Sequence, residues 1–220
     1  MRSSVRRIGK WYWPKTDGGD IGYKHPHSTW KYMQDHPDVP KLVSAHVPNR
    51  GIVVQAGGNC GFYVKQYAKL FNIVYSFEPD PLNFFCLNLN VTERNVIKLQ
   101  ACLGEKHEMV GLGNYLNDSG STHVTNEQSE HSVVPTMLID DLNLSSCDLI
   151  HLDIEGYELF ALKGAIETIK KFKPVIAYEN PAVWSGRYGY NRSTIDNFVI
   201  GLGYSFKCQE QGDMIFTYGA

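Results

Sequence analysis

The sequence predicts an α/β protein in which a mostly parallel sheet carries helices on both faces. Short, continuous apolar runs rich in β-branched residues, such as GIVVQA at 51–56, are typical of strands that are buried on both sides. Amphipathic segments of helical length separate these runs, which is the rhythm of βαβ units. A chain of 220 residues with 43% hydrophobic residues can also bury one sizeable core.

The expected strands follow one another from residue 51 to the end of the chain. In order they are 51–56, 73–78, 96–102, 148–155 and 174–180. YSFKCQ and MIFTYG then flank the turn residues EQGD, so we expect a closing β-hairpin. Residues 1–50 and 103–135 interrupt the alternation. We therefore expect an N-terminal extension at 1–50 and a main domain at 51–220.

Four helices are expected between these strands, at 62–71, 81–90, 157–172 and 193–203. In the first, Val64, Tyr67 and Phe71 fall on one helical face. Pro81 opens the second helix, and Ser193 is the expected cap of the fourth. The third is expected to be one long helix that stops before Pro174.

Composition and charge exclude several classes of protein. The formal net charge of −2 gives no general attraction to nucleic acid or to a membrane surface, so neither is expected as a partner. No apolar run approaches the roughly 18 residues that a membrane-spanning helix requires. The five cysteines are scattered and form no CxxC pair, which favours free thiols and a reducing, cytoplasmic location.

A glycine-rich turn after the first strand predicts a nucleoside site. Gly57, Gly58 and Gly61 allow the backbone to approach a ligand closely, and Glu78 follows Gly57 by 21 residues, the usual distance for an acid that binds a ribose diol. A tight turn with an exposed acid would show the same pattern. The third strand ends in small residues suited to flank an adenine ring. The candidate cofactor-binding residues are Gln55, Ala56, Gly57, Gly58, Asn59, Gly61, Glu78, Pro79, Asp80, Gln100, Ala101 and Cys102.

Several segments resemble the FkbM family of S-adenosylmethionine-dependent methyltransferases. They are VVQAGGNCG, YSFEPDP, VPTMLIDDL, DLIHLDIEGYELFALKGA and KPVIAYEN, in this order from about residue 51 to 180. The resemblance implies a class I methyltransferase (Rossmann-like), doubly wound fold with seven strands, of which the last is antiparallel. It also implies S-adenosylmethionine as cofactor and transfer to oxygen, commonly to a hydroxyl of a sugar or another natural product.

The sequence departs from the family pattern at two positions. The family usually has Asp where this chain has Gln55, and Lys where it has His151. If Gln55 faces the ammonium group of the cofactor, its carbonyl still accepts a hydrogen bond but the charge is lost, at a cost of ~1–2 kcal/mol.

Candidate catalytic residues stand at the ends of the fourth and fifth strands. Asp153, His151 and Glu179 are expected to activate the acceptor hydroxyl, since an alcohol is a poor nucleophile until it loses its proton. For His151, a hydrogen-bonded strand residue without a catalytic role is the alternative. Asp153, Glu179 and Asn180 offer three oxygen donors that suit Mg²⁺ or Mn²⁺. Two alternatives stay open: a metal bound there, or Asp153 acting alone while Glu179 binds the substrate.

The acceptor is expected to bind between the extension and the strand ends. Residues 1–50 are rich in aromatic side chains, and a helix capped by Ser28 is expected at 28–36. The candidate acceptor-binding residues are Glu155, His25, His27, Trp30, Arg187 and Tyr188. A helical cover that only packs on the sheet would also account for this segment. A sugar or glycan hydroxyl is the expected acceptor, and a phenol or lipid hydroxyl is the alternative.

Three other classes fit the sequence less well. A nicotinamide dehydrogenase normally has a GxGxxG loop, whereas this chain has GGNCG. An amino-methylating DNA enzyme would carry a Pro-Pro-aromatic segment after the fourth strand, where DIEGY stands here. The third is a module that binds a nucleoside or glycan without catalysis. Calorimetry with S-adenosylmethionine, NAD and ATP would separate these classes.

Overall fold

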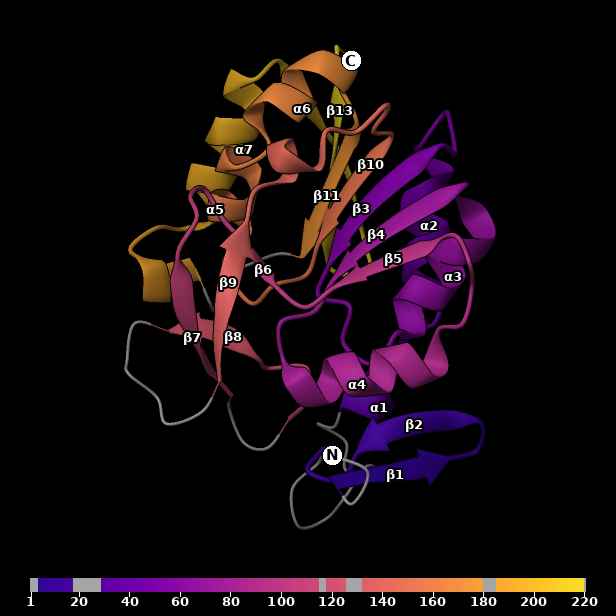
Figure 1. Ribbon diagram of the computed structural model, residues 1–220. Coiled ribbons are helices and arrows are strands. Elements are labelled where there is room, and N and C mark those ends of the chain that lie inside the picture. Colours follow the sequence, from indigo (N-terminus) through magenta and orange to yellow (C-terminus); the bar gives the residue numbers. More distant parts are fainter. Residues whose placement is uncertain (1–3, 18–28, 115–117, 126–131, 180–184, 220) are drawn as a thin grey trace.

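A seven-stranded sheet runs through the middle of the computed structural model, which describes residues 4–17, 29–114, 118–125, 132–179 and 185–219 (Figure 1). Across the sheet the strands are β5 (Val96–Leu99), β4 (Ile73–Phe77), β3 (Ile52–Ala56), β10 (Leu149–Leu152), β11 (Val175–Glu179), β13 (Asp213–Tyr218) and β12 (Tyr204–Glu210). Neighbours from β5 to β11 are parallel, and β13 is antiparallel to both β11 and β12. This order confirms the predicted fold class, including the closing hairpin and the antiparallel last strand.

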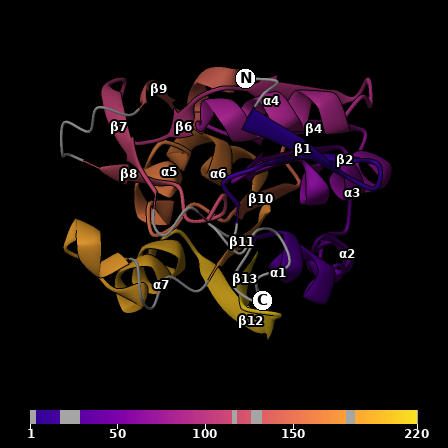
Figure 2. The same ribbon diagram turned by 90° about the horizontal axis from the view of Figure 1, so that it is seen from below.

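Helices cover both faces of this sheet because the central strands are apolar on both sides (Figures 1 and 2). All residues of β3 and β10 are buried, and neighbours such as Val53 and Val54 belong to different halves of the core. One half contains α2 (Val39–Ala45), α3 (Phe62–Leu70) and α4 (Pro81–Asn90). The other contains α5 (Glu158–Lys163), α6 (Ile166–Phe172) and α7 (Arg192–Gly201).

The prediction of one long helix at 157–172 is wrong, because α5 and α6 are separate helices. A side-chain carbon at Gly164 would lie 2.0 Å from the backbone oxygen of Gly104, so the two segments of chain are in direct contact there. Asp140, from the 3₁₀ helix η3 (Ile139–Leu142), then accepts hydrogen bonds of 3.0 and 2.7 Å from backbone N–H groups in the first turn of α6. Contacts from distant parts of the chain therefore end one helix and begin another.

The starts of two other helices are fixed by capping side chains that lie next to them in the sequence. Asp80 caps α4, as its side chain accepts backbone hydrogen bonds of 2.9 and 2.8 Å, and Pro81 opens the helix as expected. The expected cap of α7 is wrong, because Asn191, two residues before Ser193, accepts the N–H of Thr194 at 3.2 Å.

A second, four-stranded sheet lies beside the first and was not predicted. Its order is β6 (Cys102–Leu103), β9 (Val133–Met137), β7 (Met109–Gly113) and β8 (His123–Thr125). The third expected strand, 96–102, is divided accordingly: β5 ends at Leu99, and Cys102 already belongs to the second sheet. Val110, Leu112 and Val124 pack around Tyr157 to form a small separate core.

The N-terminal segment packs on the same core as α3 and α4. Its described part contains the hairpin β1 (Val5–Ile8) and β2 (Trp11–Pro14), then α1 (Thr29–Asp35) and α2. Asn90 of α4 accepts the N–H of Tyr12 at 2.7 Å and donates to its carbonyl at 2.8 Å, and Trp13 is fully buried. The helix expected at 28–36 is present as α1, the hairpin was not predicted, and Ser28 lies outside the described residues.

Candidate active site

A cavity of about 370 Å³ lies beyond the carboxyl ends of β3, β4, β10 and β11. Small-molecule sites typically measure roughly 300–1,000 Å³, and open α/β sheets bind their ligands at this edge. The cavity is lined by Thr29, Met33, Ala56, Gly57, Asn59, Phe77, Glu78, Pro79, Asn83, Ala101, Cys102, Leu103, Leu112, Asp118, Ser119, Gly120, Thr122, His123, Val124, Asp153, Ile154, Glu155, Tyr157 and Glu179.

The turn after β3 requires glycine because it touches the end of β10. Gly57 has φ +83°, and a side-chain carbon there would lie 1.9 Å from the backbone oxygen of Asp153. The N–H groups of Gly57 and Gly58 both donate to the carbonyl of Phe77, at 3.1 and 2.9 Å. The turn therefore joins the ends of β3, β4 and β10 and leaves no room for a side chain at position 57.

Glu78 follows β4 and is held against this turn. Its carboxylate accepts the N–H of Asn59 at 2.6 Å and the N–H of Asp80 at 2.9 Å, and only 3% of the residue is exposed. Burial and then the charge of Asp80 raise the pKa of Glu78 to about 8, although hydrogen bonds from Asp80, Asn59 and Asn83 act in the opposite direction. The acid is thus fixed at the cavity wall in the position expected for a ribose ligand.

Small and apolar side chains form the next part of the wall. Ala101 and Cys102 are buried beside Glu78, and Leu112 and Val124 of the second sheet also line the cavity. Burial raises the pKa of the Cys102 thiol to about 12, so this residue is neutral at physiological pH. Apolar walls of this kind suit a flat nucleobase.

A loop around Ser119 is tied over the cavity by a buried carboxylate. The carbonyl of Ser119 accepts the side-chain amides of Asn59 and Asn83, each at 2.8 Å. The N–H and hydroxyl of Ser119 donate to Asp17 at 3.2 and 3.1 Å. Asp17 also accepts from the indole of Trp13 at 2.7 Å, so it links the N-terminal segment to the cavity wall.

Three carboxylates converge at the other end of the cavity. Asp153 follows β10, Glu155 sits two residues later with φ +57°, and Glu179 ends β11. One oxygen from each carboxylate lies within 4.8 Å of the others. Glu158 shapes the turn that carries Glu155, since its carboxylate accepts the N–H groups of Ile154 and Gly156 at 3.2 Å.

Burial, and after it the charge of a neighbouring aspartate, raises the pKa of each of these acids. Burial and then the charge of Asp213 raise the pKa of Asp153 to about 6. Burial and then the charge of Asp153 raise the pKa of Glu155 to about 8 and that of Glu179 well above its usual range. The group therefore tends to hold protons or to attract a cation.

His151 lies behind this cluster and outside the cavity lining. It is completely buried, with its Nδ1 2.8 Å from the hydroxyl of Tyr67 and its Nε2 2.8 Å from Asp213. Burial lowers the pKa of His151, but the charge and hydrogen bond of Asp213 outweigh this effect and raise it overall. This position fits a hydrogen-bonded strand residue rather than the base, because β10 directs the imidazole to the face of the sheet that α3 covers, where Tyr67 lies.

Gln55 also differs from its expected role. It is fully buried and does not line the cavity. Its amide nitrogen donates to the carbonyls of Ala56 and Gly57 at 3.1 and 2.9 Å, and its oxygen accepts the hydroxyl of Ser76 at 2.9 Å. Gln55 therefore supports the glycine turn from behind rather than facing the ammonium group of a cofactor.

Four other candidate cofactor residues lie outside the lining. Gly58 and Gly61 pack against Leu87 of α4, Asp80 caps that helix, and Gln100 is exposed. The candidates that the fold brings together at the cavity are Ala56, Gly57, Asn59, Glu78, Pro79, Ala101, Cys102, Asp153, Glu155 and Glu179.

Only some of the expected acceptor-binding residues lie at the cavity. Trp30 packs edge-on against Trp13, with ring centroids 5.1 Å apart, while its neighbour Thr29 lines the cavity. Arg187 and Tyr188 lie in the 3₁₀ helix η4 (Ser185–Tyr188), and the Tyr188 hydroxyl donates to the carbonyl of Val124 at 2.8 Å. His25, His27 and Asn180 lie outside the described residues.

Sequence reasoning did not single out several individual residues of the wall. Asn83, Ser119, Thr29, Met33 and His123 line the cavity, yet they belong to no motif and come from segments without a strand–turn signal. Asn83 could have been found, because it stands two residues after Pro81 at the start of a helix that follows the predicted ribose acid.

We expect Glu78→Gln to weaken the binding of S-adenosylmethionine by about 1–3 kcal/mol, because a neutral amide replaces the acceptor for two ribose hydroxyls. With the pKa of Glu78 at about 8 in the free protein, binding to the ionised form should strengthen as the pH rises toward 8, by up to about tenfold per pH unit. Calorimetric titration between pH 6.5 and 8.5 measures both effects.

The matched control is Glu167→Gln, since the Glu167 side chain is 78% exposed on α6. It should leave both the affinity and its pH dependence unchanged. If Glu78→Gln left the pH dependence of S-adenosylmethionine binding unaltered, the assignment of Glu78 to the ribose would be wrong.

The sheet order, the glycine turn and the acid after the second parallel strand together define the class I methyltransferase fold. Residues 52–206, well over half of the chain, match the family described as "Methyltransferase FkbM domain". The protein therefore belongs to the FkbM methyltransferase family, which confirms the resemblance seen in its motifs. This membership supports S-adenosylmethionine as the cofactor.

Solved structures show the same fold at low sequence identity. An FkbM methyltransferase from Methylobacillus flagellatus KT is 17% identical, with a TM-score of 0.52 over 81% of this chain and 50% of that one. The present chain thus spans about half of that protein. A precorrin-6y C5,15-methyltransferase from Geobacter metallireducens GS-15 is 12% identical, with a TM-score of 0.51 over 83% of this chain and 88% of that one. A search of curated proteins gave no match.

Within the described residues, no helix has both the length and the apolar character that crossing a membrane would require.

Proposed function

We propose that this protein transfers a methyl group from S-adenosylmethionine to a hydroxyl group, with a sugar or glycan as the acceptor. One observation carries the proposal: a single cavity joins the glycine turn and ribose acid at one end to three carboxylates at the other. A cofactor held at the first end would direct its methyl group toward an acceptor bound at the second.

The residues at the first end fit the cofactor. Gly57 lines the cavity with backbone alone, since a side chain there would collide with the backbone oxygen of Asp153, and Glu78 offers a carboxylate to a ribose. Ala101, Cys102 and Asn83 would contact the nucleobase, and the loop at Ser119 would keep water out. When bound, S-adenosylmethionine supplies a methyl group on a sulfonium, which is already a good leaving group.

The residues at the second end would activate the acceptor. Asp153 is placed to accept the hydroxyl proton, and its pKa of about 6 leaves it mostly ionised at neutral pH. Glu155 and Glu179, with raised pKa values, would hold protons and donate hydrogen bonds to neighbouring hydroxyls. Holding the acceptor in line with the methyl group would provide most of the remaining rate enhancement.

A divalent cation is the alternative means of activation. Asp153, Glu155 and Glu179 present three hard oxygen donors within 4.8 Å of one another, which suits Mg²⁺ or Mn²⁺. Glu155 joins Asp153 and Glu179 in this group, and Asn180, the third donor expected from the sequence, lies outside the described residues. Such an ion would lower the pKa of the acceptor hydroxyl and fix its position. Asp153 acting alone and Asp153 acting with a metal both fit this cluster.

The acceptor class rests on the polar character of the cavity around these acids. Thr29, Asp118 and Thr122 add hydroxyl and carboxyl groups to the wall, which favours a polyhydroxyl compound. A phenol or a lipid hydroxyl is the second choice, and the chain's net charge of −2 gives no support to a nucleic acid. The five free cysteines fit the proposed reducing, cytoplasmic location.

Incubation with S-adenosylmethionine and a panel of oligosaccharides, phenols and hydroxylated lipids tests this function by mass spectrometry. We expect a gain of one methyl group on an oligosaccharide. Repeating the assay in EDTA, and then with Mg²⁺ or Mn²⁺ restored, separates the two means of activation: full activity in EDTA would exclude the metal. Cofactor binding without transfer to any compound would instead favour a non-catalytic module.

A further inference from the structure

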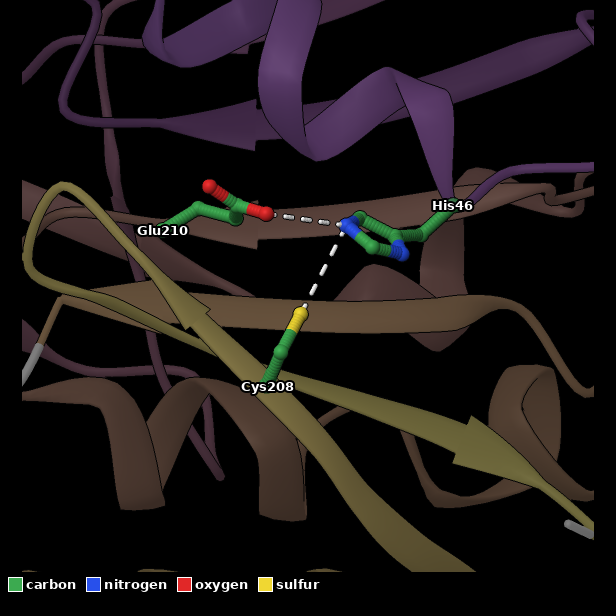
Figure 3. Close-up of side chains that lie close together, drawn as sticks. All are labelled: His46, Cys208 and Glu210. Carbon is green, nitrogen blue, oxygen red and sulfur yellow. Dashed lines mark hydrogen bonds and ion pairs between the residues drawn. The ribbon is translucent and has the colours of Figure 1, made fainter.

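A second cluster of side chains lies at the opposite edge of the sheet from β5. His46 follows the last turn of α2, whereas Cys208 and Glu210 project from β12, the edge strand (Figure 3). The three side chains point toward one another, and none of them lines the cavity described above. Their donor atoms, Nε2, Sγ and a carboxylate oxygen, all lie within 4.8 Å of one another.

An irregularity in β12 creates this arrangement. Phe206 is paired with Phe216 and Cys208 with Ile215, so one extra residue is inserted between them. Phe216 belongs to the core on the α7 side, whereas Ile215 and Cys208 belong to the core on the α2 side. Without this bulge, Cys208 would share the face of Phe206, so the bulge is what turns the thiol toward His46.

The distances match those between ligands of one metal ion. Nε2 of His46 lies 3.5 Å from Sγ of Cys208 and 3.4 Å from Oε1 of Glu210. Zinc bonds of about 2.3 Å to sulfur and about 2.0–2.1 Å to nitrogen or oxygen, at tetrahedral angles, place such atoms about 3.3–3.6 Å apart. The N···O separation is long for an ordinary hydrogen bond, the N···S separation is usual for a contact with sulfur, and both fall within this range.

The geometry does not fit a Cys–His–acid catalytic relay. In such a relay the acid holds one ring nitrogen while the nucleophile faces the other. Here both the thiol and the carboxylate face the same nitrogen of His46, Nε2. One N–H shared between both partners would give only two weak hydrogen bonds, whereas a cation between the three atoms would satisfy all of them.

The chemistry of the donors also suits a borderline-soft cation. A thiolate and a carboxylate would balance a double positive charge, and imidazole is a common zinc ligand. Among the five cysteines, Cys208 is the one that is not buried, so an ion can reach it from solvent. Burial of the thiol and then the nearby charge of Glu210 raise the pKa of Cys208, and a bound cation would reverse this by favouring the thiolate.

We propose that His46, Cys208 and Glu210 bind one zinc-class divalent cation, with water as the fourth ligand. The ion would clamp the end of α2 to the exposed edge strand of the sheet. It would therefore stabilise the fold and act at a place separate from the methyl-transfer cavity.

Titration of the metal-free protein with Co²⁺ tests the site directly, because a cobalt–thiolate bond gives an intense near-ultraviolet absorption band. We expect the band to appear with one equivalent, to disappear when Zn²⁺ is added, and to be absent in Cys208→Ser. His46→Gln and Glu210→Gln should weaken cobalt binding at least tenfold. Zn²⁺ at a hundred times its dissociation constant should raise the unfolding midpoint by about 5–10 °C.

Two controls make the outcome specific. His107→Gln removes a histidine whose side chain is 68% exposed at a distant surface and should leave the band unchanged. Asp153→Asn alters the all-oxygen cluster of the cavity and should also leave it unchanged. Absence of the band in the wild-type protein, or its persistence at full strength in both His46→Gln and Glu210→Gln, would overturn the proposal. Circular dichroism on each variant shows whether it is folded.

Discussion

Replacing Gly57 with alanine should destabilise the protein by about 2–4 kcal/mol and weaken cofactor binding at least tenfold. The new Cβ would lie 1.9 Å from the backbone oxygen of Asp153, and the backbone at this position has φ +83°. Strain of this kind costs about 1–3 kcal/mol before the collision is counted. A loss of 2–4 kcal/mol corresponds to a fall in the unfolding midpoint of roughly 5–15 °C in a chain of this size.

Gly201→Ala is the matched control for this substitution. Gly201 ends α7 and needs no positive φ, and a Cβ at this position would meet no heavy atom within 4 Å. Alanine there should leave stability unchanged or raise it by about 0.5–1 kcal/mol. If Gly57→Ala unfolded at the same temperature as the wild-type protein and bound S-adenosylmethionine equally well, the turn and β10 would not be in the close contact described here.

Replacing Asp153 with asparagine should reduce methyl transfer by about 10²–10⁴-fold while leaving cofactor affinity within a few-fold of wild type. The side chain would keep its size but could no longer accept the hydroxyl proton. Nothing at the ribose end of the cavity would change, since Glu78 is held by backbone N–H groups. Single-turnover assays and calorimetry on the same preparation measure transfer and binding separately.

Asp35→Asn controls for the loss of one negative charge, because Asp35 is half-exposed on α1 and pairs only with Lys31 among the ion pairs of the described residues. It should transfer methyl groups at the wild-type rate. An Asp153→Asn variant with normal turnover would shift the role of base to Glu155 or Glu179. A parallel loss of affinity and turnover would point to a disturbed turn instead of a missing base.

The central sheet could be predicted because its strands carry their own signal. Runs such as 51–56 and 174–180 are apolar along nearly their whole length, which is typical of strands buried on both faces. The break between α5 and α6 could not be predicted from the residues of that segment. It depends on Gly104 and Asp140, which approach Gly164 and the start of α6 from distant parts of the chain.

In the candidate site, too, the residues that could be predicted are those that a local sequence pattern marks. Gly57, Glu78 and Asp153 were found because each stands next to a recognisable strand end. Asp17 was missed, since a single aspartate in a loop shows nothing of the N–H and hydroxyl groups that meet it. Gln55 and His151 were placed on the correct strands, but the strand pleat turned both side chains toward core partners, Ser76 and Tyr67, that no local pattern reveals.

We propose that the cavity beyond β3 and β4 binds S-adenosylmethionine, with Glu78 on its ribose. Calorimetric titration of the wild-type protein with S-adenosylmethionine, NAD and ATP tests this most directly. We predict one molecule of S-adenosylmethionine bound per chain, no measurable binding of NAD or ATP, and a weakened affinity in Glu78→Gln. Binding of NAD or ATP in place of S-adenosylmethionine would show that the cavity holds another cofactor. An affinity for S-adenosylmethionine that Glu78→Gln leaves unchanged would show that Glu78 does not bind its ribose.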